Sequence, residues 1–181
     1  MGAGGSGILL HEAIGHAFEA DFNRKNTSIF SDQLNKKVCN EHINVVDDGT
    51  IPFNRGSVNI DDEGVEGQKT YIVKEGILTS YLHDRISAKH YGIPSTGNGR
   101  RESFRQMPIP RMRATYMEAG NVTEEEMIST VKKGIYDSSF TNGQVQIGAG
   151  DFTFFVKDGY LIEDGKLKQP IKDINIIGNG P

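Results

Sequence analysis

Residues 11–16 read His-Glu-Ala-Ile-Gly-His and directly follow the apolar run Ile8-Leu9-Leu10. Imidazole and carboxylate groups bind borderline-soft divalent cations, and a carboxylate beside such an ion can take a proton from a metal-activated water. The stretch therefore predicts a helical metal centre in which His11 and His16 are ligands and Glu12 is the general base.

The spacing of the two histidines constrains the local fold. In the H-E-x-x-H pattern of zinc hydrolases the imidazoles stand about 40° apart around a regular helix, whereas side chains five residues apart diverge by about 140°. His11 and His16 can bind one ion only if the helix is under-wound or ends between them, as in a single-turn π-bulge. Gly15 tolerates unusual dihedral angles best. We therefore predict a distortion between residues 11 and 16.

A purely structural role is the alternative for this stretch. In that case His11 would be a core histidine bonded to a backbone carbonyl, while Glu12 and His16 would face solvent. If the stretch does bind a metal, further side chains compete as a third ligand, although each also has an ordinary role in packing, capping or solvation; these are Cys39, Glu19, Asp21 and His42.

The composition narrows the class of protein. The 181 residues include 22 glycines and one cysteine, and 20 basic against 24 acidic side chains give a net charge of −4. The absence of a basic block argues against a direct nucleic-acid partner. No apolar run approaches the ~18 residues that span a bilayer. One cysteine excludes an internal disulfide framework, and without a secretory signal it indicates the cytoplasm.

The turn signals predict an α+β fold, mainly antiparallel β-sheet with a barrel-like character, with an N-terminal metal-binding helix and one or two further helices. Predicted helices cover residues 7–22, 85–91 and 123–133, the last opened by a capping box. Predicted strands cover residues 44–49, 57–61, 70–73, 77–83 and 174–177, and glycine turns are predicted at residues 143, 150, 159 and 165. Residues 93–113 are predicted to form a long loop.

Two further groups of polar residues have competing interpretations. Asn98, Arg100 and Arg101 lie in the predicted loop and are candidates for substrate binding, because guanidinium groups suit carboxylates and peptide carbonyls; a solvated loop is the alternative. The acidic runs at residues 47–48 and 61–63 hint at calcium, but they lack the spacing of a calcium loop and precede glycines. Turn chemistry is the better interpretation for them.

The segment from Leu9 to Arg24, with His-Glu-Ala-Ile-Gly-His at its centre, resembles the core of the TldD/PmbA metalloprotease family. The loop Thr96-Gly97-Asn98-Gly99-Arg100-Arg101-Glu102-Ser103 resembles the same family. So do shorter stretches spread over the chain, at residues 45–50, 60–64, 143–145 and 177–180. The resemblance thus extends over essentially all of the sequence.

This resemblance implies a zinc-dependent peptidase that hydrolyses unstructured peptides through a metal-activated water. His11 and His16 would bind Zn²⁺ and Glu12 would be the base. In the family a downstream cysteine is the third ligand and an N-terminal domain comes first. Residues 1–181 would therefore be part of the C-terminal catalytic domain, truncated at both ends, and would carry an incomplete site.

The family also implies partners. Its active member pairs with a related subunit that lacks the motif, so we expect an unfolded peptide as substrate and a related subunit, or a second copy of the chain, as partner. Nucleic acid and membrane are not expected as direct partners. The alternative function is that of a non-catalytic peptide-binding or assembly subunit of such a heteromeric complex. The intact His-Glu-His pattern argues against that alternative.

Overall fold

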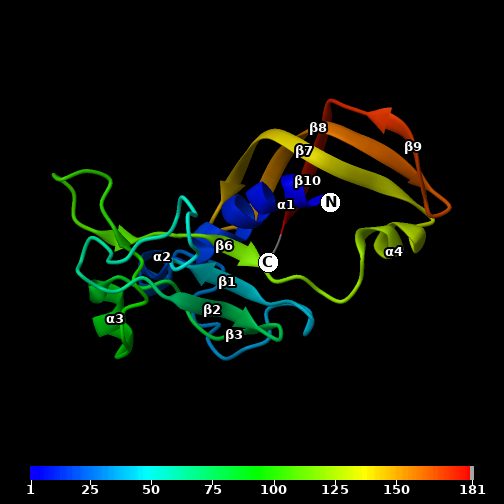
Figure 1. Ribbon diagram of the computed structural model, residues 1–181. Coiled ribbons are helices and arrows are strands. Elements are labelled where there is room, and N and C mark those ends of the chain that lie inside the picture. The colour runs from blue at the N-terminus through cyan, green and yellow to red at the C-terminus, as the bar shows by residue number, and fades with distance from the viewer. Residues whose placement is uncertain (180–181) are drawn as a thin grey trace. The chain divides into compact units, whose positions relative to one another are not determined.

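The computed structural model describes residues 1–179, apart from the side chains of residues 3 and 4, and divides them into two compact units (Figure 1). The terminal unit contains residues 1–14 and 119–179, and the central unit contains residues 15–118. Both units are built mainly from antiparallel strands with few helices, so the predicted α+β class is confirmed.

The barrel-like part of the fold prediction is wrong for the described residues. The central sheet has the order β3-β2-β1-β6, and the main sheet of the terminal unit has the order β10-β8-β7. Each is an open sheet with an edge strand at either end, because β3 and β6, like β10 and β7, do not pair with each other.

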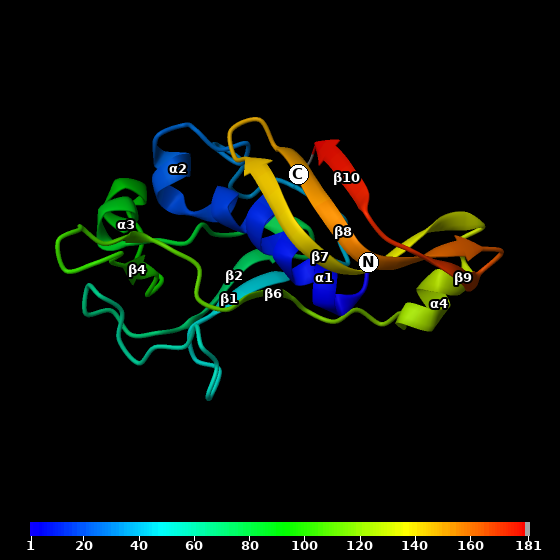
Figure 2. The same cartoon turned by 90° about the horizontal axis from the view of Figure 1, so that it is seen from above.

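The terminal unit is a long twisted hairpin with a helix on one face. Strands β7 (Lys133–Gln146) and β8 (Asp151–Glu163) pair along most of their length, and β9 (Lys166–Ile171) and β10 (Ile174–Asn179) both pair with β8. Helix α1 (Ala3–Leu9) runs along β7 in both views of the ribbon (Figure 2).

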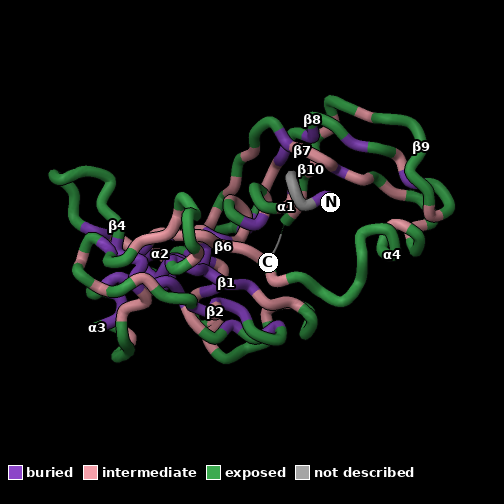
Figure 3. The backbone as a smooth tube through the Cα atoms, in the orientation of Figure 1, coloured by how far each residue is buried: buried purple, intermediate pink, exposed green. Residues whose placement is uncertain are grey.

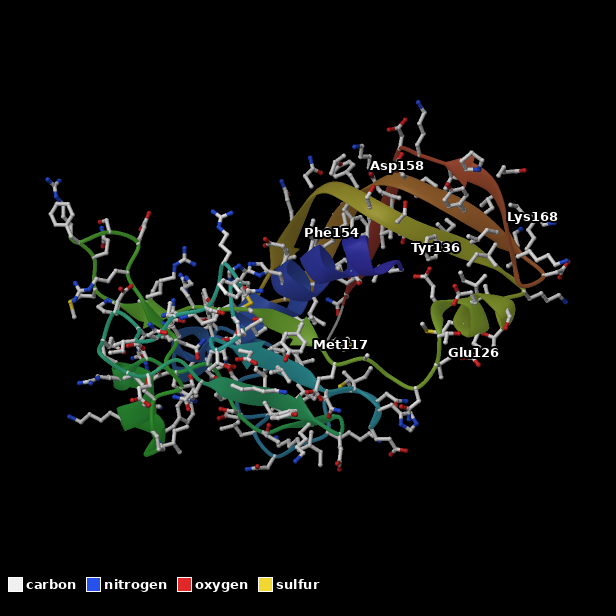
Figure 4. All side chains as sticks on the ribbon, in the orientation of Figure 1. Met117, Glu126, Tyr136, Phe154, Asp158 and Lys168 are labelled. Carbon is white, nitrogen blue, oxygen red and sulfur yellow. The ribbon has the colours of Figure 1, made fainter. Side chains whose placement is uncertain are left out.

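Apolar side chains hold helix and hairpin together in the terminal unit. Phe140, Phe154 and Val156 form a buried cluster on β7 and β8, and Leu9 and Ala13 pack against it. Polar side chains of the same unit are exposed: those of Asp158 and Lys168 point outward from β8 and β9 (Figure 4). The burial of three large apolar side chains of this kind stabilises the unit by roughly 1.5–3 kcal/mol each.

Two of the four predicted glycine turns are wrong. Gly150 and Gly165 have φ angles of +76° and +74° and do form turns. Gly143 instead lies inside β7, where a Cβ atom would meet the ring of Phe154 at 2.2 Å. Gly159 lies inside β8, where a Cβ would meet the Tyr136 carbonyl oxygen at 2.6 Å. A close approach, not a turn, requires glycine at these two positions.

The central unit contains a four-stranded sheet, two short helices that contact each other, and long loops. The strands are β1 (Val45–Asp48), β2 (Lys69–Lys74), β3 (Ile77–Leu78) and β6 (Thr115–Met117), and a separate pair consists of β4 (Gly99–Arg100) and β5 (Ile109–Pro110). In Figure 3 buried residues follow β1, much of β2 and helix α2 (Ala20–Arg24), whereas helix α3 (Arg85–Tyr91) buries only Ser87 and Ala88. Fully buried side chains such as Ile72, Leu82 and Tyr81 form the core.

Several local predictions hold in the central unit. Helix α3 begins at the cap Asp84 and ends at Gly92, whose φ of +68° is the left-handed conformation that favours glycine. The hairpin β2–β3 turns at Glu75 and Gly76 as predicted, although β3 is shorter than residues 77–83. The strand β6 was not predicted.

Other predictions fail for identifiable reasons. Residues 57–61 form no strand: Ile60 makes a single bridge, and the Val58 amide donates to Gly49 instead of a ladder. The capping box of α4 (Glu124–Ser129) is present, but the helix ends before residue 133, because Lys133 already pairs with Glu163 in the β7–β8 ladder. No helix among the described residues is long and apolar enough to cross a membrane.

Candidate metal centre

The predicted helix at residues 7–22 is broken into four parts, and the break falls on the His-Glu-Ala-Ile-Gly-His stretch. Helix α1 continues directly into a π-helical turn, Leu10–Gly15, followed by a 3₁₀ turn, His16–Phe18, and by α2. In a π-turn the hydrogen bonds join residues five apart, so positions i and i+5 share one face. The distortion predicted from the histidine spacing is confirmed. Gly15 keeps ordinary helical angles, φ −57° and ψ −49°, so the π-turn does not depend on glycine's freedom.

The π-turn gathers three potential metal-binding side chains. One ligand atom each from His11, Glu12 and His16 lies within 4.8 Å of the other two. His11 is exposed, and the other two are half-buried. Donor atoms around one tetrahedral zinc ion stand about 3.4 Å apart, so small side-chain rotations suffice to bring this set onto an ion. The donors are therefore of the right kind and close enough to hold Zn²⁺.

His16 is oriented by a buried carboxylate. Its Nδ1 forms a 3.1 Å hydrogen bond with Glu19 Oε1, and Glu19 is fully buried. The other carboxylate oxygen, Oε2, accepts a hydrogen bond from Arg111 Nη1 at 2.8 Å. Glu19 was considered from the sequence as a third ligand; its position three residues after His16 was the available signal. Arg111, 92 residues further on, could not be found that way.

The backbone around Glu19 is fixed on both sides. The chain leaves the 3₁₀ turn at Glu19 in an extended conformation and forms a parallel bridge with Leu82. Leu82 N donates to Phe18 O, and Ala20 N donates to Leu82 O, both at 3.0 Å. The Asn23 amide closes the bend by donating to the Ala17 and Glu19 carbonyls. The carboxylate beside His16 thus has a rigid support.

The remaining candidates for a third ligand lie outside this cluster. Among the described residues, His11, Glu12 and His16 form the one group of three or more histidine, cysteine or acidic side chains gathered closely enough for a metal. Cys39 is held near the β2–β3 hairpin, where its amide donates to Gly76, and burial raises the pKa of its thiol. Asp21 forms a loose ion pair with Lys25 at 3.8 Å.

The structure separates the three residues proposed for substrate binding. Asn98 is buried: its amide donates to Asp47 Oδ2 at 2.7 Å and to the Arg111 carbonyl at 3.0 Å, and its Oδ1 accepts from Thr96. Arg101 is exposed and its guanidinium donates to the Gln106 carbonyl. The loop therefore combines an internal hydrogen-bonding residue with surface cations.

Arg100 lines a surface pocket of about 530 Å³ with two other arginines. The pocket walls come from residues 54–56, 58, 100 and 112–113, so Arg55, Arg100 and Arg113 face a common space. Arg113 is anchored there by the Gly97 and Gly99 carbonyls at 3.3 and 3.0 Å. Burial lowers the pKa of its guanidinium, the carboxylates of Asp61, Asp62 and Asp47 oppose this shift, and the charge of Arg100 adds to it. Such a pocket can hold an anionic group.

The acidic runs serve turns, as expected from the sequence. Asp48 Oδ1 accepts from the Thr50 amide and hydroxyl, and Asp61 Oδ1 accepts from the Glu63 and Val65 amides. Asp47 is buried and accepts hydrogen bonds from Asn98, Arg113 and Thr115; burial raises the pKa of its carboxyl, against the effect of these bonds.

A model of the PmbA/TldA metallopeptidase C-terminal domain matches residues 2–181. The chain belongs to this family. The resemblance seen in the sequence is confirmed.

Similar proteins of the family are named as metalloproteases. A metalloprotease TldD homolog of Buchnera aphidicola is 49% identical over 180 residues, which cover 99% of this chain and 37% of that protein. A zinc metalloprotease TldD homolog of Saccharolobus solfataricus is 38% identical, covering 96% of this chain and 39% of that protein. The chain thus spans less than half the length of these relatives.

Solved structures have the same fold. TldE from Thermococcus kodakarensis superposes with a TM-score of 0.84 at 26% identity, covering 98% of this chain and 40% of that one. A Thermotoga maritima protein titled as a putative modulator of a DNA gyrase superposes with a TM-score of 0.80 at 25% identity, covering 90% of this chain and 37% of that one.

Proposed function

We propose that this chain carries the zinc-binding and proton-transferring residues of a peptidase that hydrolyses unstructured peptides. The observation that carries the proposal is the π-turn, which brings His11, Glu12 and His16 within 4.8 Å of one another although a regular helix would separate the histidines. The family match and the name of the Saccharolobus relative, which includes zinc, support the same chemistry.

In this proposal His11 and His16 hold Zn²⁺, which when bound supplies a Lewis acid that polarises a carbonyl and acidifies water. Glu12 stands beside both imidazoles and accepts the proton of the attacking water. The same carboxyl group then delivers that proton to the departing amine nitrogen, so one side chain acts as base and then as acid.

Peptide binding is proposed for the arginine pocket. Arg100 shares it with Arg55 and Arg113, and guanidinium groups pair with carboxylates through two parallel hydrogen bonds. Arg101, the next residue after Arg100 and also exposed, would add to the positive charge. Asn98, whose side-chain amide donates to Asp47 and to the Arg111 carbonyl, would hold this loop in place.

A non-catalytic peptide-binding or assembly subunit is the second candidate. One observation favours it: with Glu12 assigned as the base, this cluster of described residues offers two imidazoles as ligands, whereas catalytic zinc sites commonly have three protein ligands besides water. In either role we propose a related subunit, or a second copy of the chain, as partner, and the cytoplasm as compartment, where a lone thiol such as Cys39 stays reduced.

Zinc-dependent hydrolysis separates the two candidates. The full-length protein is purified without added metal, and its zinc content is measured by elemental analysis for the parent and for His11→Ala. Hydrolysis of a denatured protein is then followed before and after treatment with a chelator and after zinc is restored. A peptidase loses activity with the metal and regains it. Zinc-independent peptide binding without cleavage would instead support the non-catalytic subunit.

A further inference from the structure

Resting on the proposed metal-binding role of His16, we propose that Glu19 and Arg111 act together as a positioning pair for its imidazole. Glu19 would hold the ring in the tautomer with the proton on Nδ1, and Arg111 would hold Glu19. Neither side chain would touch the substrate. Their role would be to keep the Nε2 lone pair of His16 directed at the metal.

The tautomer follows from the hydrogen bond at Glu19. A carboxylate has no proton to donate, so the 3.1 Å contact requires that His16 Nδ1 carries the hydrogen. A neutral imidazole has a single N–H group, and Nε2 is then the nitrogen with the lone pair that a metal needs. In metal-binding histidines the N–H of the second ring nitrogen generally donates a hydrogen bond to such a partner.

The ion pair explains how a carboxylate can occupy this position. Glu19 has no exposed surface, and a buried charge is costly unless it is paired and hydrogen-bonded. Its two oxygens have separate partners: Oε1 accepts from His16, and Oε2 accepts from Arg111 at 2.8 Å. Because each oxygen is committed to one partner, the carboxylate cannot rotate without breaking one of these bonds.

Arg111 is itself held in place by Asn98. The Arg111 amide donates to the Asn98 carbonyl at 2.9 Å, and the Asn98 side-chain amide donates back to the Arg111 carbonyl at 3.0 Å. The Arg111 guanidinium also donates to the Pro110 carbonyl at 2.7 Å. A chain of contacts thus runs from the loop around Asn98, through Arg111 and Glu19, to His16.

The first measurement needs no variant. In the metal-free full-length protein labelled with ¹⁵N at histidine, the ring signals of His16, identified by their loss in His16→Gln, should show the proton on Nδ1. A proton found on Nε2 of His16 in the folded parent would overturn the proposal. This readout does not depend on hydrolysis, so it also separates this proposal from the proposed peptidase activity.

The second measurement is zinc affinity, by competition with a chelator. Glu19→Gln should bind zinc about 10- to 100-fold more weakly, as is typical when the partner of a ligand histidine is lost, and its His16 tautomer should become mixed. Arg111→Gln changes a residue whose side chain is 31% exposed, and should shift both readouts in the same direction by less. Arg111→Lys should restore part of the loss.

The matched control is Glu118→Gln, which removes another acidic partner of a basic side chain in the central unit, the 3.0 Å pair with Lys69. It should leave zinc affinity and the His16 tautomer unchanged. If Glu19→Gln does not fold, the parent tautomer and Arg111→Gln still decide the matter. Folded Glu19→Gln and Arg111→Gln proteins whose zinc affinity stays within two-fold of the parent would overturn the proposal.

Discussion

His16 and His83 both belong to the central unit, yet their surroundings are opposite. The side chain of His16 is 28% exposed, and its Nδ1 donates to a buried carboxylate. His83 is fully buried, and neither of its ring nitrogens has a hydrogen-bond partner among the described residues. Tyr81 and Tyr91 surround the His83 ring edge-on, with centroids 6.1 and 5.4 Å away.

The difference shows what prepares an imidazole for a metal. Burial alone lowers the pKa of His83 to about 4, which keeps the ring neutral but gives neither nitrogen a fixed role. His16 has an acceptor on one nitrogen, so the other is defined as the donor of a lone pair. The two sites are also connected, because the Glu19 backbone bridges to Leu82, next to His83. A substitution that affects one of these histidines should therefore be checked for an effect on the other.

The largest expected effect is that of Glu12→Gln on hydrolysis, because Glu12 lies in the same metal-binding stretch as His16. Glu12→Gln removes the proposed base but keeps the size of the side chain, so hydrolysis by the full-length protein should fall by roughly 10²–10⁴-fold, the usual contribution of general acid–base catalysis. Zinc content should not change. Glu41→Gln, on the surface beside Lys37, is the control. Cleavage by Glu12→Gln at the parent rate would rule out the assigned role.

The next effect is the pH dependence of the folding stability that arises from His83. The folded-state pKa of His83, about 4, lies below the ordinary value of 6.5. Between these two values the unfolded chain binds a proton that the folded chain does not. The stability is therefore fully present above pH 6.5 and is lost as the pH falls towards 4. The loss amounts to about 3 kcal/mol.

The matched variant for this effect is His83→Phe, which keeps an aromatic ring between Tyr81 and Tyr91. Urea unfolding of parent and variant from pH 7 to pH 4 isolates the contribution of the histidine, because the other titrating groups are common to both. The parent should lose about 3 kcal/mol more than the variant over this range. Parallel curves would mean that His83 is protonated in the folded protein and that the contrast with His16 is smaller than described.

The same comparison shows how far the sequence could lead. Histidines five residues apart predicted the helical distortion, because only an under-wound turn places them on one face. Gly92 predicted the end of α3, because the left-handed turn that it forms depends on neighbouring residues alone. Local rules were sufficient wherever the cause of a structure lies within a few residues of it.

Long-range packing could not be predicted in this way. Glu19 meets Arg111 across 92 residues, and nothing near either residue in the sequence indicates the other. Asn98 was singled out as a candidate for substrate binding in a long loop, whereas its side chain is buried and bonds to Asp47 and Arg111. Gly143 was taken as a turn signal because its real cause, the ring of Phe154 on the paired strand, is eleven positions away.

A smaller effect tests whether Asn98 stabilises the fold around Arg111, the residue that holds Glu19 beside His16. Asn98→Ala leaves the Asp47 carboxylate and the Arg111 carbonyl each without one donor, so the free energy of unfolding should fall by roughly 1–3 kcal/mol. Arg101→Gln, an exposed change in the same loop, should leave stability unchanged. If Asn98 contacts substrate instead of supporting Arg111, its truncation would raise KM and leave the unfolding curve in place.

The smallest expected effect is that of Cys39→Ser on metal binding, and it tests whether any thiol of this chain completes the site. Cys39 lies where its backbone borders Gly76 in the β2–β3 hairpin, outside the group of donors at His11, Glu12 and His16. Burial raises the pKa of its thiol, which disfavours the thiolate that a metal requires. Zinc affinity, measured by chelator competition, should therefore stay within two-fold of the parent. A ten-fold loss would instead make Cys39 a ligand, and metal binding would then depend on the loop beside the hairpin as well as on the π-turn.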